Sequence, residues 1–363
     1  MRVHPIQPLL PIEGIAENGA NENGSNQTNG QNAIDEQDRP VHDWYRFVLS
    51  YPPHLVREYM QDFGLTHEST ILDPFCGTGT TVVEAKLCGI PSIGIEANPF
   101  PHFASTVKTD WSINPDELLG QADEIAHITY QELSSQGLDD RAAAGEPNVP
   151  LRTLPPETMR ILIKDSISPL PLHKTLVLLE HINHRSNVPI HKYCLLGLGN
   201  ALVNSIGNLR FGPEVGVGKR KADAPVVGLW MHEIRKMAHD LRLIQRQQHA
   251  EATIHLGDAR QLASILSPCS IDAVITSPPY PNEKDYTRTT RLESVLLGFF
   301  TDMAELREHK QMLLRSNTRG VYKIDNDDLW VDDNPRIQHL ADLMKRAGWK
   351  WAKRLVLKNY MAA

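Results

Sequence analysis

The sequence lacks several features that would direct its interpretation elsewhere. Of its 363 residues only 4 are cysteines, and no two form a Cys-x-x-Cys pair, so neither a zinc site nor a disulfide framework is indicated. The 16 histidines show no metal-ligand spacing, and His181 and His184 are expected in a polar loop or on a helix face. No segment is apolar for long enough to cross a membrane, and the N-terminus has no signal-peptide stretch. These absences favour a soluble, cytoplasmic protein without a metal centre.

The net charge of −7 argues against a nucleic-acid partner until its distribution is considered. Residues 17–40 are rich in Asn, Gly, Gln and acidic side chains, and they predict a disordered leader over residues 1–40 that makes the total more negative. Basic clusters occur at Arg210 with residues 219–221 and over residues 345–358, the latter with two tryptophans. Such clusters could neutralise phosphates, or they could be solvated helix faces.

A glycine loop follows the first pattern of a buried strand. Residues 69–72 are apolar and β-branched, and residues 80–88 have helical spacing, so Gly77 and Gly79 lie between a strand and a helix. Glycine permits a positive φ and close approach of a ligand, and the free N–H groups at the start of a helix favour an anion.

An acidic residue, Glu96, ends the next predicted strand at residues 91–95. This position after a glycine loop is suited to accept hydrogen bonds from ribose hydroxyls. The loop has no third glycine at dinucleotide spacing and no Gly-Lys-Ser/Thr, so an oxidoreductase and an NTPase are both disfavoured. A simple tight turn remains the alternative for the glycines alone.

A proline loop follows another buried-strand pattern at residues 271–276. Its sequence is Ser277-Pro278-Pro279-Tyr280-Pro281. The prolines fix φ and remove N–H donors, so the carbonyls of Ser277 and Pro278 can face a ligand. Acceptors of this kind suit the exocyclic amine of cytosine or adenine, because hydrogen bonds from its two N–H groups favour the pyramidal, nucleophilic form. Tyr280 could stack on a base that has left the duplex, although an isolated proline-rich stretch is also typical of a surface turn.

The two loops together carry a resemblance. Asp73-Pro74-Phe75-Cys76-Gly77-Thr78-Gly79-Thr80 and Ser277-Pro278-Pro279-Tyr280 resemble the DNA amino-methyltransferases, which make N4-methylcytosine or N6-methyladenine. The resemblance implies that the first loop binds S-adenosylmethionine and that the second is catalytic. It implies cofactor contacts from Asp73, Pro74, Phe75, Gly77, Gly79, Thr80 and Glu96. Serine at the first position of the second loop is found mostly in cytosine-N4 enzymes, which sets the preferred base.

Three further positions are interpreted beside this resemblance. Asp258, after a predicted strand at residues 252–256, matches an acid that lies near the cofactor adenine in the family, or it is an ordinary helix N-cap. Tyr51 lies in a segment, residues 47–56, that resembles the part closing over the methionine end of the cofactor, or that simply starts a helix. Cys269 follows a proline as in cytosine-C5 methyltransferases, but it precedes its strand, so we do not interpret it as a nucleophile.

The predicted fold class is α/β, a Rossmann-like class I methyltransferase sheet with a mostly helical insertion. Residues 41–110 would form the cofactor-binding part and residues 251–363 the catalytic part. The insertion, residues 111–250, is far longer than a strand–helix connection needs and would recognise the target or cap the site. Its helices are expected at residues 115–136, 156–164, 192–206 and 226–246.

The carboxyl end is short for this fold. Helices are expected at residues 287–300, 303–314 and 335–347, followed by one short apolar run at residues 355–357. The resembling fold has three more strands after the catalytic loop, so the sequence predicts a truncation there.

The sequence therefore predicts a site-specific DNA methyltransferase acting on cytosine N4, with double-stranded DNA as its partner and a companion restriction endonuclease. The alternatives are an adenine-N6 enzyme, an RNA base methyltransferase and a truncated, inactive DNA-binding remnant.

Overall fold

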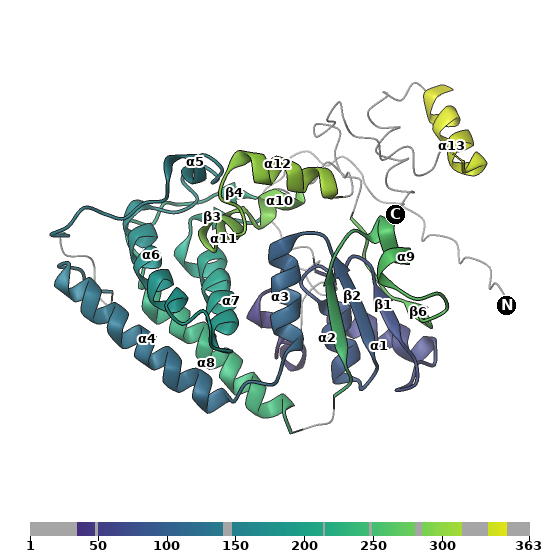
Figure 1. The fold of residues 1–363 in the computed structure, drawn as a ribbon, viewed down its shortest axis with the longest axis horizontal. Coiled ribbons are helices and arrows are strands. Elements are labelled where there is room, and N and C mark those ends of the chain that lie inside the picture. The colour runs from purple at the N-terminus through teal and green to yellow at the C-terminus, as the bar shows by residue number, and fades with distance from the viewer. Residues whose placement is uncertain are drawn as a thin grey trace, which may run out of the picture. The chain divides into compact units, whose positions relative to one another are not determined.

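The central element is a parallel β-sheet. The computed structural model describes residues 35–47, 50–140, 147–212, 215–246, 249–279, 285–313 and 333–346. Four strands pair in parallel in the order β5-β2-β1-β6 (Figure 1). They are β1 (Ile71–Asp73), β2 (Ser92–Glu96), β5 (Ala252–Leu256) and β6 (Ala273–Val274). The strand order reverses at β1, and open α/β sheets bind ligands outside the carboxyl ends of strands at such a switch point. The predicted α/β class with a Rossmann-like sheet is confirmed.

Helices α1 (Pro53–Asp62), α2 (Thr80–Leu87) and α3 (Pro99–Thr109) form one layer against the sheet. Helix α2 lies between the other two, and both α2 and α3 contact the strands. Pro53 occupies the first turn of α1, where its missing N–H leaves no hydrogen bond unmade. The predicted helix start after residue 51 is therefore present, while Tyr51 itself stays outside the helix.

The chain between α3 and β5 is mostly helical, as predicted. It contains α4 (Pro115–Ser135), α5 (Pro156–Met159), α6 (Pro169–Asn183), α7 (His191–Ala201), one π-helical turn η3 (Leu202–Ile206) and α8 (Val226–Ile244). A short antiparallel hairpin, β3 (Leu209–Arg210) and β4 (Gly216–Val217), precedes α8.

Two expectations within this region were wrong. The helix predicted over residues 156–164 covers only Pro156–Met159, and α6 was not predicted. The prolines at 169 and 171 resemble helix breakers in the sequence, but both lie in the first turn of α6, where proline is tolerated.

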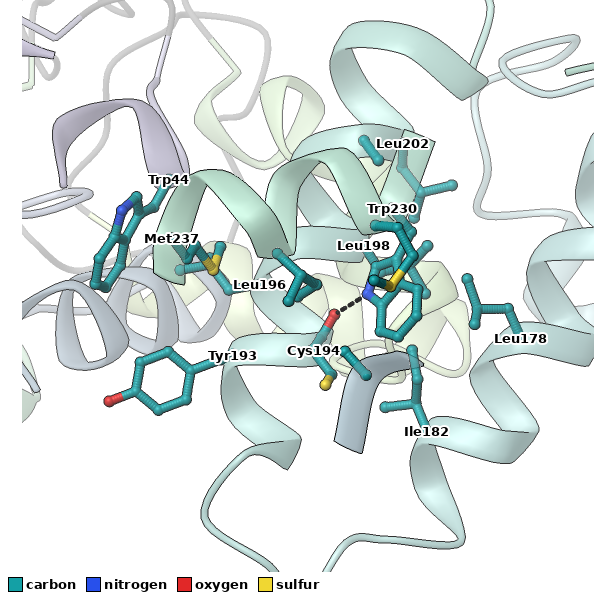
Figure 2. Close-up of a cluster of buried hydrophobic side chains, with 14 of the residues drawn as sticks. Trp44, Leu178, Ile182, Tyr193, Cys194, Leu196, Leu198, Leu202, Trp230 and Met237 are labelled. Carbon is teal, nitrogen blue, oxygen red and sulfur yellow. Dashed lines mark hydrogen bonds between the residues drawn. The ribbon is translucent and has the colours of Figure 1, made fainter. Parts of the chain in front are cut away.

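One hydrophobic core joins the helical region to the sheet layer. Phe100 and Val107 of α3 belong to the same buried cluster as the inward faces of α4, α6, α7 and α8. Figure 2 shows part of this cluster, in which the Trp230 Nε1 donates to the carbonyl oxygen of Cys194 at 2.9 Å. Because the core continues across residue 110, the predicted boundary between the cofactor part and the insertion does not interrupt the packing.

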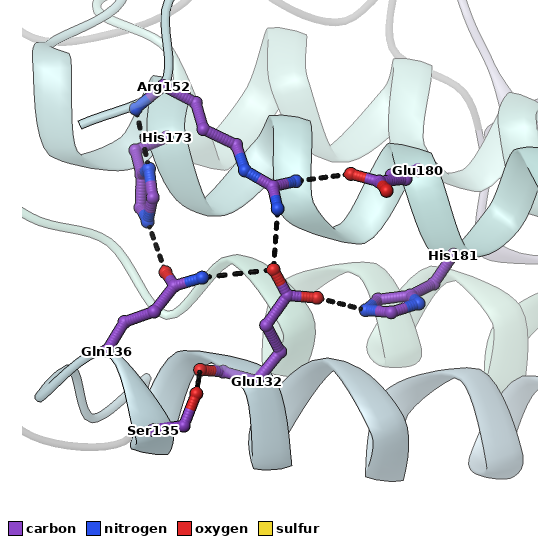
Figure 3. Close-up of polar contacts among 7 residues, drawn as sticks. All are labelled: Glu132, Ser135, Gln136, Arg152, His173, Glu180 and His181. Carbon is purple, nitrogen blue, oxygen red and sulfur yellow. Dashed lines mark hydrogen bonds and ion pairs between the residues drawn. The ribbon is translucent and has the colours of Figure 1, made fainter. Parts of the chain in front are cut away.

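A polar network ties α4 to α6 (Figure 3). The Arg152 guanidinium contacts Glu132 Oε1 at 2.6 Å and Glu180 Oε2 at 2.5 Å. His173 accepts from the Arg152 backbone N–H and contacts Gln136 Oε1 at 2.7 Å. His181 is bound to Glu132 on the face of α6, and the described residues contain no group of three or more possible metal ligands.

The segment before α1 is anchored by buried charges. Its elements are η1 (Glu36–Asp38) and η2 (His42–Trp44). Arg57 contacts Asp38 at 2.8 Å and Glu84 at 2.7 Å, and His42 Nε2 lies 2.7 Å from the other oxygen of Glu84. Residues 35–40, assigned to the leader from the sequence, are therefore part of this fold. Residues 1–34 lie outside the described residues.

Apart from β6, the secondary structure in the described residues after β5 consists of short helices. They are η4 (Ala259–Gln261), α9 (Leu262–Ile265), α10 (Tyr286–Thr289), α11 (Arg291–Leu296), α12 (Met303–Met312) and α13 (Pro335–Arg346). The single helix predicted over residues 287–300 is divided between α10 and α11. Within the described ranges no strand follows β6, and the apolar run at residues 355–357 lies outside them. None of the helices described has the length and apolar character needed to span a bilayer.

Candidate active site

A pocket opens at the carboxyl ends of the parallel strands. It encloses about 1060 Å³ when the open solvent at its mouth is included. The loops after all four strands contribute to it, together with the segment before α1. Its walls consist of Phe47, Ser50, Tyr51, Pro74, Phe75, Cys76, Gly77, Thr78, Thr80, Glu96, Ala97, Asn98, Pro101, Gly257, Asp258, Ala259, Arg260, Ser277, Pro278, Pro279, Tyr286, Met312 and Leu313.

The two glycines of the glycine loop have different surroundings. Gly77 has a φ of +53°, lines the pocket, and would carry a Cβ with no atom within 4 Å. Gly79 has a φ of +89° and is the N-cap of α2, and a Cβ there would lie 3.0 Å from Ser105 Cβ on α3. Gly79 does not line the pocket. Its lack of a side chain lets α2 pack on α3, whereas that of Gly77 leaves room on the ligand side.

Glu96 connects the loops after β1 and β2. Its Oε2 accepts from the Gly77 N–H at 2.9 Å and its Oε1 from the Asn98 N–H at 2.7 Å. Burial raises the pKa of Glu96 to about 7, although these backbone hydrogen bonds oppose the shift. The carboxylate is therefore oriented by the backbone, and near neutral pH it is divided between its two protonation states.

Two polar side chains of the pocket wall are buried without a hydrogen-bond partner in the described part of the chain. They are Thr78, through its Oγ1, and Asn98, through its Oδ1. A buried polar atom left unpaired costs about 1–3 kcal/mol, so such atoms in a pocket wall favour a polar ligand. S-adenosylmethionine, with its amino, carboxyl and ribose groups, fits this set together with Glu96.

Asp73 lies behind the pocket wall rather than in it. It is fully buried and accepts from the Phe75 N–H at 3.1 Å, the Thr276 hydroxyl at 2.6 Å and the Tyr51 hydroxyl at 3.2 Å. Burial raises the pKa of Asp73, and the hydrogen bonds counteract that rise. The cofactor contact that the resemblance implies for Asp73 stays a prediction. In this structure its hydrogen bonds join Phe75, Thr276 and Tyr51, and it is not among the residues that line the pocket.

The proline loop forms a second part of the pocket wall. Ser277, Pro278 and Pro279 line the pocket, and Tyr280 lies outside the described residues. The loop is anchored just before Ser277, where the Thr81 hydroxyl donates to the carbonyl oxygen of Ile275 at 3.1 Å. The β6 loop thus takes its position from the side chains of the β1–α2 unit.

Asp258 is a helix N-cap, and its proximity to the cofactor adenine stays a prediction. It lines the pocket and also caps η4, because its Oδ1 accepts from the Arg260 N–H at 2.9 Å. The Arg260 side chain also donates to the Asp258 carboxylate, with its Nε 2.9 Å from Oδ1. Arg260 lines the pocket as well.

Sequence reasoning missed several lining residues. No motif marks Arg260, Tyr286 or Asn98, because each is brought to the pocket by packing rather than by local sequence. The nearest signal is positional: Asn98 lies two residues beyond Glu96 at the end of β2. Cys269, by contrast, is exposed and does not line the pocket, in line with its interpretation as an uninvolved thiol.

Comparison with known proteins agrees with this geometry. A family model described as DNA methylase, for N6 and N4 methyltransferases, matches residues 20–103. Over these residues the chain is similar to the N6 and N4 amino-methyltransferases of DNA. No solved structure matches it significantly.

The curated relatives are Type II methyltransferases. M.BsoBI of Geobacillus stearothermophilus is 28% identical over 305 residues, covering 79% of this chain and 58% of the relative. M.AvaI of a Nostoc strain is 22% identical over 281 residues, covering 74% of this chain and 57% of the relative. M.MjaII of Methanocaldococcus jannaschii is 37% identical over 73 residues, covering 20% of this chain and 14% of the relative. The chain therefore spans somewhat more than half the length of the first two relatives.

Proposed function

We propose that this chain transfers a methyl group from S-adenosylmethionine to an exocyclic amine of double-stranded DNA, with cytosine N4 as the preferred target. One observation carries the proposal: the glycine loop with Glu96 and the proline loop with Ser277 line a single pocket. A donor and an acceptor of a methyl group must meet within one site, and this arrangement brings their expected binding residues together.

The first wall supplies groups for the cofactor. Glu96 would accept hydrogen bonds from ribose hydroxyls, and the unpaired oxygens of Thr78 and Asn98 would accept from donors of the same ligand. Gly77 leaves the loop backbone open on the pocket side. When bound, the cofactor supplies an electrophilic methyl group on a sulfonium centre.

The second wall acts on the base. The Ser277 side chain and the carbonyl of Pro278 would accept the two N–H groups of the target amine and favour its pyramidal form. Pro278 and Pro279 fix the backbone, so these acceptors are oriented before the base arrives. Tyr280 would stack on the extruded base. Serine at position 277, rather than Asn or Asp, is the basis of the preference for cytosine.

The test is methyl transfer followed by identification of the modified base. Duplex DNA is incubated with the full chain and methyl-labelled cofactor, digested to nucleosides and separated. We expect labelled N4-methylcytosine. Label in N6-methyladenine would reverse the choice of base, and label only in folded RNA would reject DNA as the substrate. Cofactor binding without transfer to either nucleic acid would identify a non-catalytic remnant.

A companion is proposed from the relatives. Because the curated relatives are named Type II methyltransferases, we propose the same class for this chain, with a restriction endonuclease of matching sequence specificity as its partner. DNA methylated by the chain should then resist cleavage by that nuclease at the shared site.

A further inference from the structure

A basic surface is formed by the β3–β4 hairpin and the segments that are hydrogen-bonded to it. It is formed by Lys164, Arg210, Lys219, Arg220 and Arg288, all of them exposed, and we call these five residues the basic hairpin surface. They come from the turn before α6, the β3–β4 hairpin and α10 (Figure 1). The chain as a whole carries a net charge of −7, so this concentration of cations runs against the average charge.

Hydrogen bonds hold the elements of this surface together. Asn208 is buried, and its polar groups form hydrogen bonds to three segments. Its Nδ2 donates to the carbonyl oxygen of Asp165 at 2.9 Å, and its Oδ1 accepts from the Lys221 N–H at 2.9 Å. Its backbone carbonyl accepts from the Gly218 N–H at 2.7 Å. The Arg288 Nε donates to the carbonyl oxygen of Val215 at 3.2 Å, which joins α10 to the hairpin. The cations are therefore carried on a preorganised backbone.

Most of these cations have no carboxylate partner. Arg220 forms an ion pair with Asp165. No ion pair with a described carboxylate is formed by Lys164, Arg210, Lys219 or Arg288. Exposed cations without acidic partners fit a polyanion, and a guanidinium suits the oxygens of a phosphate.

The surface adjoins the mouth of the pocket. Arg288 is on α10 two residues after Tyr286, which lines the pocket, and α10 follows the proline loop in the chain. A base that enters the pocket from a duplex leaves its flanking phosphates beside the mouth, and Arg288, on the same short helix as Tyr286, connects the mouth to the basic hairpin surface.

We infer that the basic hairpin surface binds the sugar–phosphate backbone of the DNA duplex that flanks the target base. This inference rests on the proposed function and extends it by assigning a DNA contact surface to residues outside both motif loops. Contacts to phosphates position a protein on DNA without reading its sequence, so the effect of these side chains is expected to be the same for all DNA sequences.

The test is the salt dependence of DNA binding by the full chain. The triple variant Arg210→Gln, Lys219→Gln, Arg288→Gln is titrated into fluorescein-labelled duplex DNA of mixed sequence at several salt concentrations. Each lost phosphate contact lowers the slope of log K against log salt by about 0.9, so the triple variant should lose about 2.7. Its affinity near 0.1 M salt should fall on the order of 10²-fold.

Two controls separate this result from misfolding and from general charge. The triple variant Arg235→Gln, Arg242→Gln, Arg246→Gln removes exposed cations on and just after α8 and should keep the wild-type slope. Arg210→Lys with Arg288→Lys retains the charges and should also keep it. Each variant loses side-chain contacts, among them the Arg288 bond to Val215 and the ion pairs of Arg235 and Arg242, so thermal unfolding is used to show that all three stay folded at the assay temperature. Cofactor affinity should be unchanged in all three variants.

The inference is overturned if the first triple variant keeps the wild-type slope, or if the α8 variant loses as much. It is also overturned if the wild type binds folded RNA more tightly than duplex DNA and only RNA binding responds to the triple variant. Methyl transfer is measured separately: an unmethylated product beside a reduced salt slope would reject the proposed function while leaving the DNA contact surface in place.

Discussion

The glycine loop follows β1 and the proline loop follows β6, its parallel neighbour, but the two loops are held in place by different contacts. The glycine loop is fixed by its own unit, through the Gly77 N–H to Glu96 and the Cys76 N–H to the carbonyl oxygen of Ile95 at 3.0 Å. The proline loop follows the two-residue strand β6, and Asp73 and Thr81 anchor it from the β1–α2 unit. The comparison teaches that the proposed catalytic loop depends on the cofactor half for its position.

The largest effect is expected from Ser277→Ala, which removes a proposed acceptor in the proline loop and leaves the anchors at Ile275 and Thr276 in place. Loss of one preorganised hydrogen-bonding group commonly lowers turnover by ~10²-fold or more, and cofactor affinity should stay nearly unchanged. Turnover from labelled methyl transfer, and affinity from calorimetry, would together show whether the two loops can be separated.

Cys269→Ser is the matched control for that experiment. Transfer to nitrogen needs no covalent intermediate, and Cys269 is exposed and outside the pocket, so the variant should remain active. An inactive Cys269→Ser beside a fully active Ser277→Ala would instead indicate methylation at carbon.

The anchor between the loops is tested by Asp73→Ala. This change leaves the Thr276 hydroxyl and the Phe75 N–H without their acceptor. Each of these donors that stays unpaired should lower the free energy of unfolding by about 1–3 kcal/mol. Asp73→Asn retains one acceptor oxygen and should lose less. Urea unfolding of both variants checks this order. Equal stability of wild type and Asp73→Ala would contradict the role of Asp73 as the anchor of the proline loop.

The glycine loop alone is tested by pH and by Glu96. Because burial raises the pKa of Glu96 to about 7, the carboxylate gains a proton as pH falls through 7 and can then accept fewer hydrogen bonds from ribose. Cofactor affinity should therefore fall below pH 7, by up to about tenfold per pH unit if only the ionised form binds.

Glu96→Ala should weaken cofactor binding by about 1–3 kcal/mol and abolish that pH dependence. Calorimetry between pH 5.5 and 8.5 would measure both effects. An unchanged affinity in this variant would contradict the assignment of Glu96 to the cofactor.

The smallest effect is expected at the glycines themselves. Gly77→Ala places a side chain at a positive φ but in open space, which should cost about 1 kcal/mol of stability. Gly79→Ala adds the contact with Ser105 and should be less stable by a further ~1 kcal/mol. Thermal unfolding of the pair distinguishes a backbone requirement from a packing requirement, and the reverse order would refute the packing role of Gly79.

Much of the architecture could be predicted from local pattern. Strands β1, β2, β5 and β6 and helices α2, α4 and α8 were each marked by apolar periodicity and by glycine or proline at their ends. Helices α3 and α6 were missed because the prolines in their first turns resemble breaks. Local pattern cannot distinguish a proline that ends a helix from one that begins it.

Local sequence was enough to predict that the glycine and proline loops lie at one edge of a parallel sheet, where both line the pocket. Only the tertiary structure decided what several of those residues do. Asp73 and Thr276 are 203 positions apart in the chain, and their hydrogen bond depends on the pairing of β1 with β6. Gly79 likewise meets Ser105 only because α2 packs on α3. Side-chain contacts between distant segments follow from packing, which no local spacing records.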